Sequence, residues 1–253
     1  MPVFRPTADC IWNTFRSSGK TRILLSGGEE EEKQELLSQL QAMGYGVLET
    51  TGVSDELIVD LDNPYGNPGC VILASGLGTR FGGNKLMAPF RGEPMICRAI
   101  AATEGIFSRR VVVTRHPEVA ELCAKLDVPA LLHALPYRSD TVRLGLEALG
   151  DVDGCLFCPG DQPLLKRQTV ASLALWAKNE PDSILRPAFE GIPGAPVFFP
   201  RWAFPELKTL PAGKGGGVLA KKYPASVRLL HLTDGKQLQD ADTPEALAWL
   251  ARQ

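Results

Sequence analysis

The segment Cys70–Leu86, CVILASGLGTRFGGNKL, constrains the fold more than any other part of the chain. Its apolar start, Val71–Ala74, is short and rich in β-branched residues, which predicts a buried strand of a parallel sheet. Glycines and two cations follow, at Gly76, Gly78, Arg80, Gly82, Gly83 and Lys85. Glycines let consecutive backbone N–H groups turn toward an anion, and the cations add to the attraction. We therefore predict a polyphosphate-binding loop rather than a tight surface turn with solvated charges.

Neither of the two common phosphate-binding motifs accounts for this loop. It lacks the P-loop pattern G-x-x-x-x-G-K-[ST], and the third glycine of the dinucleotide pattern G-x-G-x-x-G would fall at Phe81. The tripeptide Gly19-Lys20-Thr21 is like the end of a P-loop, but Thr14 occupies the position of the first glycine. An apolar run follows this tripeptide instead of preceding it, so an exposed turn is the favoured interpretation.

The loop resembles the signature L-A-x-G-x-G-x-R-x-G-x-x-K of nucleotidyltransferases, and most closely that of the molybdopterin cytidylyltransferase-like group, which includes molybdopterin guanylyltransferase. The matching residues are Leu73, Ala74, Gly76, Gly78, Arg80, Gly82 and Lys85. The resemblance covers roughly residues 70–253. It implies that the loop binds a nucleoside triphosphate, with Arg80 and Lys85 as catalytic cations. The nucleotide-binding residues implied here are Leu73, Ala74, Ser75, Gly76, Gly78, Thr79, Arg80 and Lys85.

The chain before this domain predicts a small β-α-β unit. Residues 1–20 show no clean period and are interpreted as irregular. Strands are expected at 22–26, 46–50 and 56–61, and a helix at 29–43. The turn formers at 63–69 predict a linker. We place the domain boundary there, between a segment 1–67 of unassigned role and a nucleotidyltransferase domain 68–253.

Strands and helices alternate along the second domain. The pattern predicts strands at 110–114, 128–133, 154–158, 184–188, 196–199 and 227–232, and helices at 94–104, 117–126, 139–149, 169–178, 216–222 and after 243. This alternation is typical of an α/β fold with a mostly parallel sheet and helices on both faces. The resemblance adds that the fold is Rossmann-like, of the nucleotide-diphospho-sugar transferase type.

Three aspartates are candidate metal ligands. Asp161 stands in a Gly-Asp-Gln-Pro segment just beyond a predicted strand, where ligands of open α/β sheets bind. Mg²⁺ typically takes one or two carboxylates together with substrate phosphates. The resemblance implies that Asp161 is a Mg²⁺ ligand and a catalytic residue, and that Asp240 and Asp242 complete the site. The alternatives are a turn cap for Asp161 and a helix-start residue for Asp242.

Two further segments resemble the family, and both include departures from it. Gly191–Val197 matches G-x-x-G-x-P-V, which implies that Gly194 approaches the second substrate. Ser139 begins a segment that corresponds to a serine-rich helix start near the nucleoside, although Asp140 replaces a serine. The glycine-rich run 212–217 lacks the Asp and Arg of the family pattern G-D-x-G-x-R. In the family that the loop resembles, the residue between the Ala and the Gly of the first motif follows the base: alanine accompanies cytidine and glycine accompanies guanosine. Ser75 occupies this position and is neither, but it has a β-carbon as alanine does, which favours CTP.

Composition excludes some partners and metal sites. The net charge is −2 with mixed signs, so we expect no nucleic-acid or membrane partner, and no apolar run is long enough to span a membrane. The N-terminus has no signal-peptide core, and the six cysteines are interpreted as reduced core thiols, which predicts a cytoplasmic protein. The pair Cys155 and Cys158 would point to opposite faces of a strand, and the three histidines are scattered, so neither forms a metal site.

The hypothesis that follows from these motifs is metal-assisted nucleotidyl transfer. It needs positioning and charge neutralisation rather than a protein nucleophile. By resemblance, CMP from CTP would be joined to the phosphate of molybdopterin with release of pyrophosphate, using Mg²⁺ or alternatively Mn²⁺. One alternative is a cytidylyltransferase with another phosphorylated acceptor. The other is a non-catalytic accessory protein that binds nucleotide or molybdenum cofactor during maturation of a molybdoenzyme apoprotein.

Overall fold

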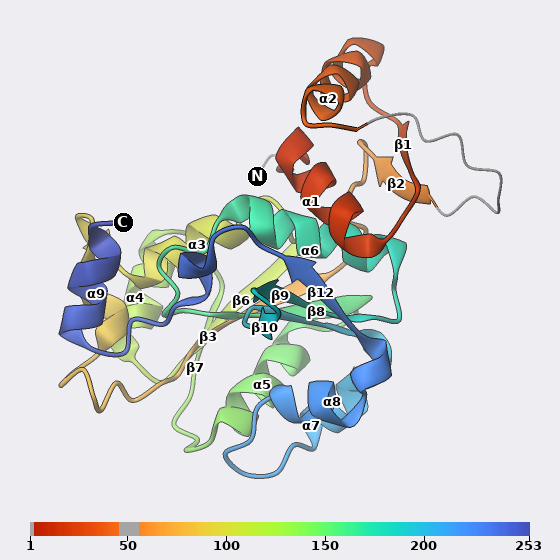
Figure 1. Cartoon of the computed structure of the whole chain (residues 1–253). Coiled ribbons are helices and arrows are strands. Elements are labelled where there is room, and N and C mark those ends of the chain that lie inside the picture. Colours follow the sequence, from red (N-terminus) through yellow and green to blue (C-terminus); the bar gives the residue numbers. More distant parts are fainter. Residues whose placement is uncertain (1–2, 46–55) are drawn as a thin grey trace.

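A computed structural model describes residues 3–45 and 56–253 of the chain, and an eight-stranded sheet lies at its centre (Figure 1). The strands are β3 (Gly69–Ala74), β6 (Arg109–Thr114), β7 (Ala130–Leu132), β8 (Gly154–Pro159), β9 (Ile184–Phe189), β10 (Ile192–Pro193), β11 (Val197–Pro200) and β12 (Val227–His231). Their order is β10-β9-β11-β8-β3-β6-β7, and β12 pairs with β9. All run in one direction except β10 and β11, which are antiparallel to their neighbours. The predicted α/β fold with a mostly parallel sheet is confirmed.

Helices cover both faces of this sheet. One face carries α3 (Ile96–Thr103), α4 (Pro117–Lys125), α6 (Arg167–Asn179) and α9 (Pro244–Ala251), and the other carries α5 (Arg138–Leu149), α7 (Phe204–Lys208) and α8 (Gly217–Lys222). A short hairpin, β4 (Pro89–Phe90) and β5 (Glu93–Pro94), stands apart from the sheet. The sequence patterns did not predict α7, β10 or this hairpin, which are all five residues or shorter.

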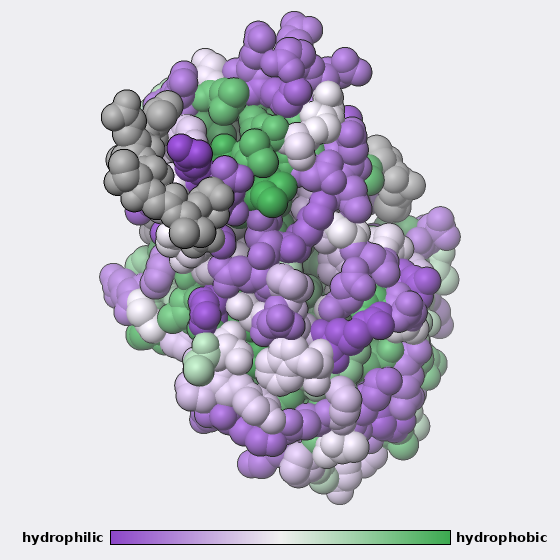
Figure 2. Space-filling view, turned by 90° about the vertical axis from the view of Figure 1, so that its right-hand side faces the viewer, coloured by the Kyte–Doolittle hydropathy of each residue, from purple (hydrophilic) through white to green (hydrophobic). Residues whose placement is uncertain are grey.

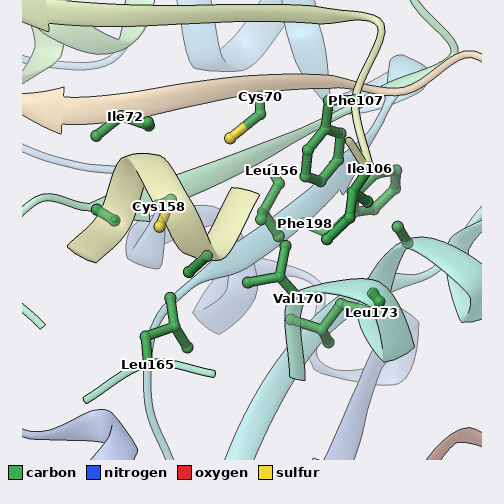
Figure 3. Close-up of a cluster of buried hydrophobic side chains, with 14 of the residues drawn as sticks. Cys70, Ile72, Ile106, Phe107, Leu156, Cys158, Leu165, Val170, Leu173 and Phe198 are labelled. Carbon is green, nitrogen blue, oxygen red and sulfur yellow. The ribbon is translucent and has the colours of Figure 1, made fainter. Parts of the chain in front are cut away.

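Side chains of β3 alternate between two core clusters, one on each face of the sheet. Cys70, Ile72 and Ala74 belong to the cluster beneath α3 and α6, while Val71 belongs to the cluster beneath α5. Figure 3 shows Cys70 and Ile72 in the first cluster, together with side chains of β8 and α6. On the second face, a β-carbon at Gly145 of α5 would lie 2.6 Å from a methyl group of Val71. The missing side chain therefore allows α5 to lie close against the strand that leads into the glycine loop.

The N-terminal residues contain a helix, so the prediction that residues 1–20 are irregular is wrong. Helix α1 (Ala8–Ser18) begins after Thr7, whose side chain accepts a hydrogen bond from the Cys10 N–H at 3.4 Å. Its buried face meets α6: the Thr14 hydroxyl donates to the Ser172 carbonyl at 3.2 Å, and the Ser172 hydroxyl donates to the Cys10 carbonyl at 3.1 Å. The pattern was missed because small and polar residues form much of this face, and packing against α6 stabilises it.

The other described residues of the N-terminal segment form a two-stranded parallel sheet with one helix. It consists of β1 (Arg22–Ser26), α2 (Glu30–Ala42) and β2 (Glu56–Asp60), which confirms the two strands and the helix predicted there. The strand predicted at 46–50 lies outside the described residues. The side-chain amide of Asn179, from α6, donates to the carbonyl of Ile58 at 2.9 Å and accepts from its N–H at 2.7 Å. Apolar surface gathers on this segment (Figure 2), where Leu24 and Ile58 are each 45% exposed.

The two parts of the chain share one core. Buried residues of α1, β1 and β2 belong to the same cluster as those of α3 and α6. The boundary between residues 67 and 68 therefore remains a prediction about the chain's organisation. Among the described residues, no helix has both the length and the apolar character needed to cross a membrane.

Candidate active site

The glycine loop leaves β3 at the carboxyl edge of the sheet and folds back on itself. Gly78 has φ of 61°, and a β-carbon there would lie 2.3 Å from the Gly83 carbonyl oxygen. Only glycine fits both this left-handed conformation and this close approach. The N–H groups of Phe81 and Gly82 donate to the Gly78 carbonyl at 2.8 and 3.2 Å. The loop thus has a defined path that ends in a 3₁₀ turn beginning at Lys85.

An ion-pair network joins the loop to two distant aspartates. The Lys85 Nζ lies 2.6 Å from Asp161 Oδ2 and 2.7 Å from Asp242 Oδ1, and Arg80 lies 2.6 Å from the other oxygen of Asp242. Burial alone would lower the pKa of Lys85, but attraction to Asp161 and Asp242 outweighs it and raises that pKa. The hydrogen bond from Lys85 lowers the pKa of Asp242 in turn. Four of the predicted site residues therefore form one charged cluster.

Asp240 lies beside this cluster in a more enclosed environment. Burial first, and then the charge of Asp161, raise the pKa of its carboxyl group. The Gln162 amide donates to Asp240 Oδ1 at 3.0 Å and to the Leu238 carbonyl at 3.2 Å. The Gln162 amide oxygen is buried and has no hydrogen-bond partner among the described residues. Carboxylate oxygens next to an unpaired amide oxygen are the donor types that Mg²⁺ prefers.

A ready-made metal cage is not present in the described part of the chain. No group of three or more His, Cys, Asp or Glu side chains is arranged there to hold an ion. Lys85 occupies an oxygen of Asp161 and one of Asp242. The residues therefore fit a cation that would take one or two carboxylates and complete its shell with substrate phosphates and water.

A cavity of about 500 Å³ opens beside the cluster, at the carboxyl edge of the sheet. Of the predicted site residues, it is lined by Leu73, Ser75, Gly76, Asp161, Gly194 and Asp240. Lys85, Arg80 and Asp242 reach it only through their ion pairs with Asp161 and with each other. The binding and metal roles of these residues remain predictions.

Besides Arg80 and Lys85, four predicted nucleotide-binding residues do not line the cavity: Ala74, Gly78, Thr79 and Ser139. Ala74 is buried, and its carbonyl accepts a hydrogen bond from Thr114 at 2.9 Å. Thr79 is exposed on the loop beside Gly78. Ser139 is buried within the first turn of α5, and the helix begins at Arg138 rather than at Ser139.

The start of α5 differs from the prediction because of Asp140. The Tyr137 N–H donates to the Asp140 carboxylate at 3.0 Å, which satisfies a backbone group at the helix start. The acidic residue that departs from the family pattern therefore stabilises this turn. Arg138 and Thr141, on either side of it, line the cavity instead of Ser139.

The Ser75 side chain is fully engaged within the protein. Its hydroxyl lies 3.1 Å from the Val113 carbonyl and 2.9 Å from His133 Nε2. His133 Nδ1 accepts from the Leu135 N–H at 3.2 Å, so in the neutral ring the proton is on Nε2, which donates to Ser75. The Ser75 carbonyl accepts two bonds from Arg115, at 3.0 and 2.7 Å. Ser75 thus holds a fixed backbone position at the cavity wall.

Sequence reasoning missed three cavity arginines. Arg115, Arg138 and Arg186 all line the cavity, together with Gln162 and Tyr137. Gln162 could have been found, since it follows Asp161 directly in the Gly-Asp-Gln-Pro segment. Arg115 follows a strand, Arg186 lies on one and Arg138 starts a helix, and a single arginine at such a position belongs to no motif, so only the fold brings the three together.

Comparison with known proteins shows which family this chain belongs to. The family model for the MobA-like NTP transferase domain matches residues 70–227, which is more than half of the chain. The chain belongs to the MobA-like NTP transferase family. The match confirms the resemblance read from the first motif, and this chain is therefore a nucleotidyltransferase. Residues 1–69 and the segment with Asp240 and Asp242 lie outside the matched range.

Two curated proteins are similar to this MobA-like chain. Purine catabolism protein PucB of Bacillus subtilis (strain 168) is 28% identical over 194 residues, which cover 69% of this chain and 91% of PucB. The 3-deoxy-manno-octulosonate cytidylyltransferase of Gemmatimonas aurantiaca is 31% identical over 86 residues, covering 32% of this chain and 33% of that enzyme.

Solved structures share the fold. Rv0371c of Mycobacterium tuberculosis H37Rv superimposes with a TM-score of 0.65 at 23% identity, covering 74% of this chain and 99% of Rv0371c, and it has also been solved in complex with manganese. Molybdopterin-guanine dinucleotide biosynthesis protein A of Archaeoglobus fulgidus gives a TM-score of 0.58 at 18% identity, covering 73% of this chain and 97% of that protein. At these identities the likeness establishes the fold of the MobA-like domain.

Proposed function

We propose that this MobA-like transferase joins CMP from CTP to the phosphate of molybdopterin and releases pyrophosphate. The observation that carries the proposal is the cluster in which Lys85, on the glycine loop, bonds both Asp242 and the cavity-lining Asp161. It combines cations for a triphosphate with carboxylates for a metal, in a domain whose family transfers nucleotides.

The chain's own residues position the reactants and neutralise charge. A triphosphate on the glycine loop would be bound by loop N–H groups and by Arg80 and Lys85. An oxygen of the acceptor phosphate attacks the α-phosphorus, and the bond from that phosphorus to the bridging oxygen breaks as pyrophosphate leaves with the electron pair. Asp161, with Asp240 and Asp242, would hold Mg²⁺ or Mn²⁺, which supplies Lewis-acid stabilisation of the phosphate charge.

The choice of CTP rests on the first motif. Ser75 has a β-carbon, as the alanine of cytidine-specific relatives does, and its fixed carbonyl stands at the cavity wall. The 3-deoxy-manno-octulosonate enzyme of Gemmatimonas aurantiaca is named a cytidylyltransferase and supports the same base. We expect pyrophosphate release to be faster with CTP than with GTP.

The decisive experiment follows pyrophosphate from purified protein supplied with one nucleoside triphosphate, Mg²⁺ and molybdopterin. Asp161→Asn should abolish release, because the side chain keeps its shape but loses its charge. Asp151→Asn is the matched control: its side chain is 82% exposed and it precedes β8, at the end opposite Asp161. Full activity in Asp161→Asn would disprove the metal role, and no release from the wild-type protein with any triphosphate would disprove the transfer.

Two alternatives have specific support. The similarity to the 3-deoxy-manno-octulosonate enzyme favours an acceptor other than molybdopterin, which competition between acceptors in the same assay would reveal. The run 212–217, without the family's Asp and Arg, favours an accessory protein that binds cofactor and passes it to a molybdoenzyme apoprotein. Nucleotide binding without pyrophosphate release would identify that role. All six cysteines are free thiols, which supports our proposal that the protein acts in the cytoplasm.

A further inference from the structure

Strand order divides the cavity into two halves. The glycine loop follows β3, Asp161 follows β8, and Arg186 lies on β9, and the sheet order is β9-β11-β8-β3. Asp161 therefore stands between the glycine loop and Arg186. A nucleotide on the loop, with its phosphates near Asp161, leaves the β9 half of the cavity for the second substrate.

The Arg186 guanidinium is held firmly in this half. Its Nε donates to the Gly194 carbonyl at 3.0 Å and one Nη2 hydrogen reaches the Pro193 carbonyl at 3.4 Å. A guanidinium has five N–H groups. The other three have no acceptor among the described residues, and the side chain lines the cavity.

Arg186 also lacks a counter-ion in the described part of the chain. No carboxylate oxygen lies within 4.0 Å of it, whereas Arg80 and Lys85 at the other half are both paired with aspartates. It is half-buried, and burial lowers its pKa. A partly buried guanidinium whose only hydrogen-bond partners are carbonyl groups is stabilised when it binds an anion.

Building on the proposed function, we propose that Arg186 binds the anionic group of the acceptor. The guanidinium fork matches two oxygens of one group, as presented by a phosphomonoester or a carboxylate. Arg186 would hold that group on the far side of Asp161 from the nucleotide. The acceptor is therefore an anion before it reacts, and Arg186 distinguishes it from a neutral alcohol.

Titration calorimetry of the apo protein with inorganic phosphate, and separately with acetate, tests this without turnover. Arg186→Met keeps the stem and removes the charge, and should weaken binding of the preferred anion by about tenfold or more. Arg186→Lys should restore part of it. Arg228→Met is the matched control, because Arg228 lies on β12 beside β9 and pairs with Glu180 outside the cavity. It should bind as the wild type does.

A second experiment measures KM for each substrate by steady-state kinetics. Arg186→Met should raise KM for the acceptor about tenfold and leave KM for CTP unchanged. An unchanged phosphate and acetate affinity in Arg186→Met, a loss caused by Arg80→Met instead, or a rise in KM for CTP would each overturn the assignment. If the wild-type protein releases no pyrophosphate, the proposed function fails, while the titrations still decide whether Arg186 binds an anion.

Discussion

At the scale of single residues, Lys85 holds the site together. One ammonium group bonds carboxylates from two segments that are far apart in sequence, and its side chain is only 10% exposed. The motif predicts a cation that faces the triphosphate. It does not predict that the same cation neutralises the candidate metal ligands, because that contact depends on where β8 and the C-terminal segment end.

Lys85→Met should reduce pyrophosphate release by roughly a hundredfold or more, since it removes a positioned charge from the transferred phosphates. The change also leaves Asp161 and Asp242 facing each other without their shared cation. Single-turnover measurements at saturating CTP would show the loss in the chemical step. Lys222→Met serves as control and should keep full activity, because Lys222 contacts Glu206 and the Tyr223 ring, neither of which lines the cavity. Equal rates in both variants would contradict the role of Lys85.

His133 should make stability depend on pH. Burial first, and then the charge of Arg115, lower its pKa, while Asp140 opposes the shift. The unfolded chain, with a histidine pKa of about 6.5, then binds more protons than the folded one, so the free energy of unfolding falls as pH drops below about 6.5. Urea unfolding at pH about 7.5 and 5.5 should show a larger loss in wild type than in His133→Gln. Identical losses would disprove the contribution.

At the scale of elements, the glycine loop was the most predictable part of the chain, because its motif is contiguous and the positive φ of Gly78 and of Gly82 gives a local reason for glycine at those two positions. The position of Asp161 just beyond a strand and the helix after residue 243 were also predictable, since both follow from short contiguous segments. The Thr243 side chain caps that helix by accepting from the Ala246 N–H at 3.2 Å. Helix α1 was not predictable in this way. Its buried face is mixed in polarity, and its stability comes from α6, more than 150 residues later in the chain.

Gly78→Ala should weaken CTP binding by roughly tenfold, because a side chain at this φ is strained and overlaps the Gly83 carbonyl. Gly83→Ala is the matched control: a β-carbon there meets no atom within 4 Å. Equilibrium titration with CTP compares the two. If both variants bind CTP equally well, the path of the loop is not what holds the triphosphate.

At the scale of the whole molecule, the sequence predicts a sheet covered by helices on both faces but not the order of the strands within that sheet. Alternating strands and helices indicate a covered sheet, yet no local pattern tells that β11 inserts between β8 and β9 in the opposite direction. The arrangement of the cavity depends on that insertion, because β11 separates the strand that carries Arg186 from the strand that Asp161 follows. Its lining could therefore be predicted only where a motif marks it, as at Asp161 and Gly194.

The shared core predicts that both parts of the chain unfold together. Ile11 is fully buried, so Ile11→Ala should lower the free energy of unfolding by about 2–5 kcal/mol in a single transition. Fluorescence of Trp176, buried in α6, together with circular dichroism during urea unfolding would report it. Leu24→Ala, at a side chain 45% exposed, should change the value by about 0.5 kcal/mol or less. Two separate transitions would instead support independent domains divided at residues 67 and 68.

The side-chain amide of Asn179 affects how readily copies of this molecule associate through the edges of their sheets. By offering one donor and one acceptor to Ile58, it imitates the peptide group of a neighbouring strand. A two-stranded sheet has two open edges, and open edges recruit strands from other molecules. A single side chain from α6 thus occupies the backbone groups of Ile58 at the β2 edge. It discourages edge-to-edge polymerisation at this position.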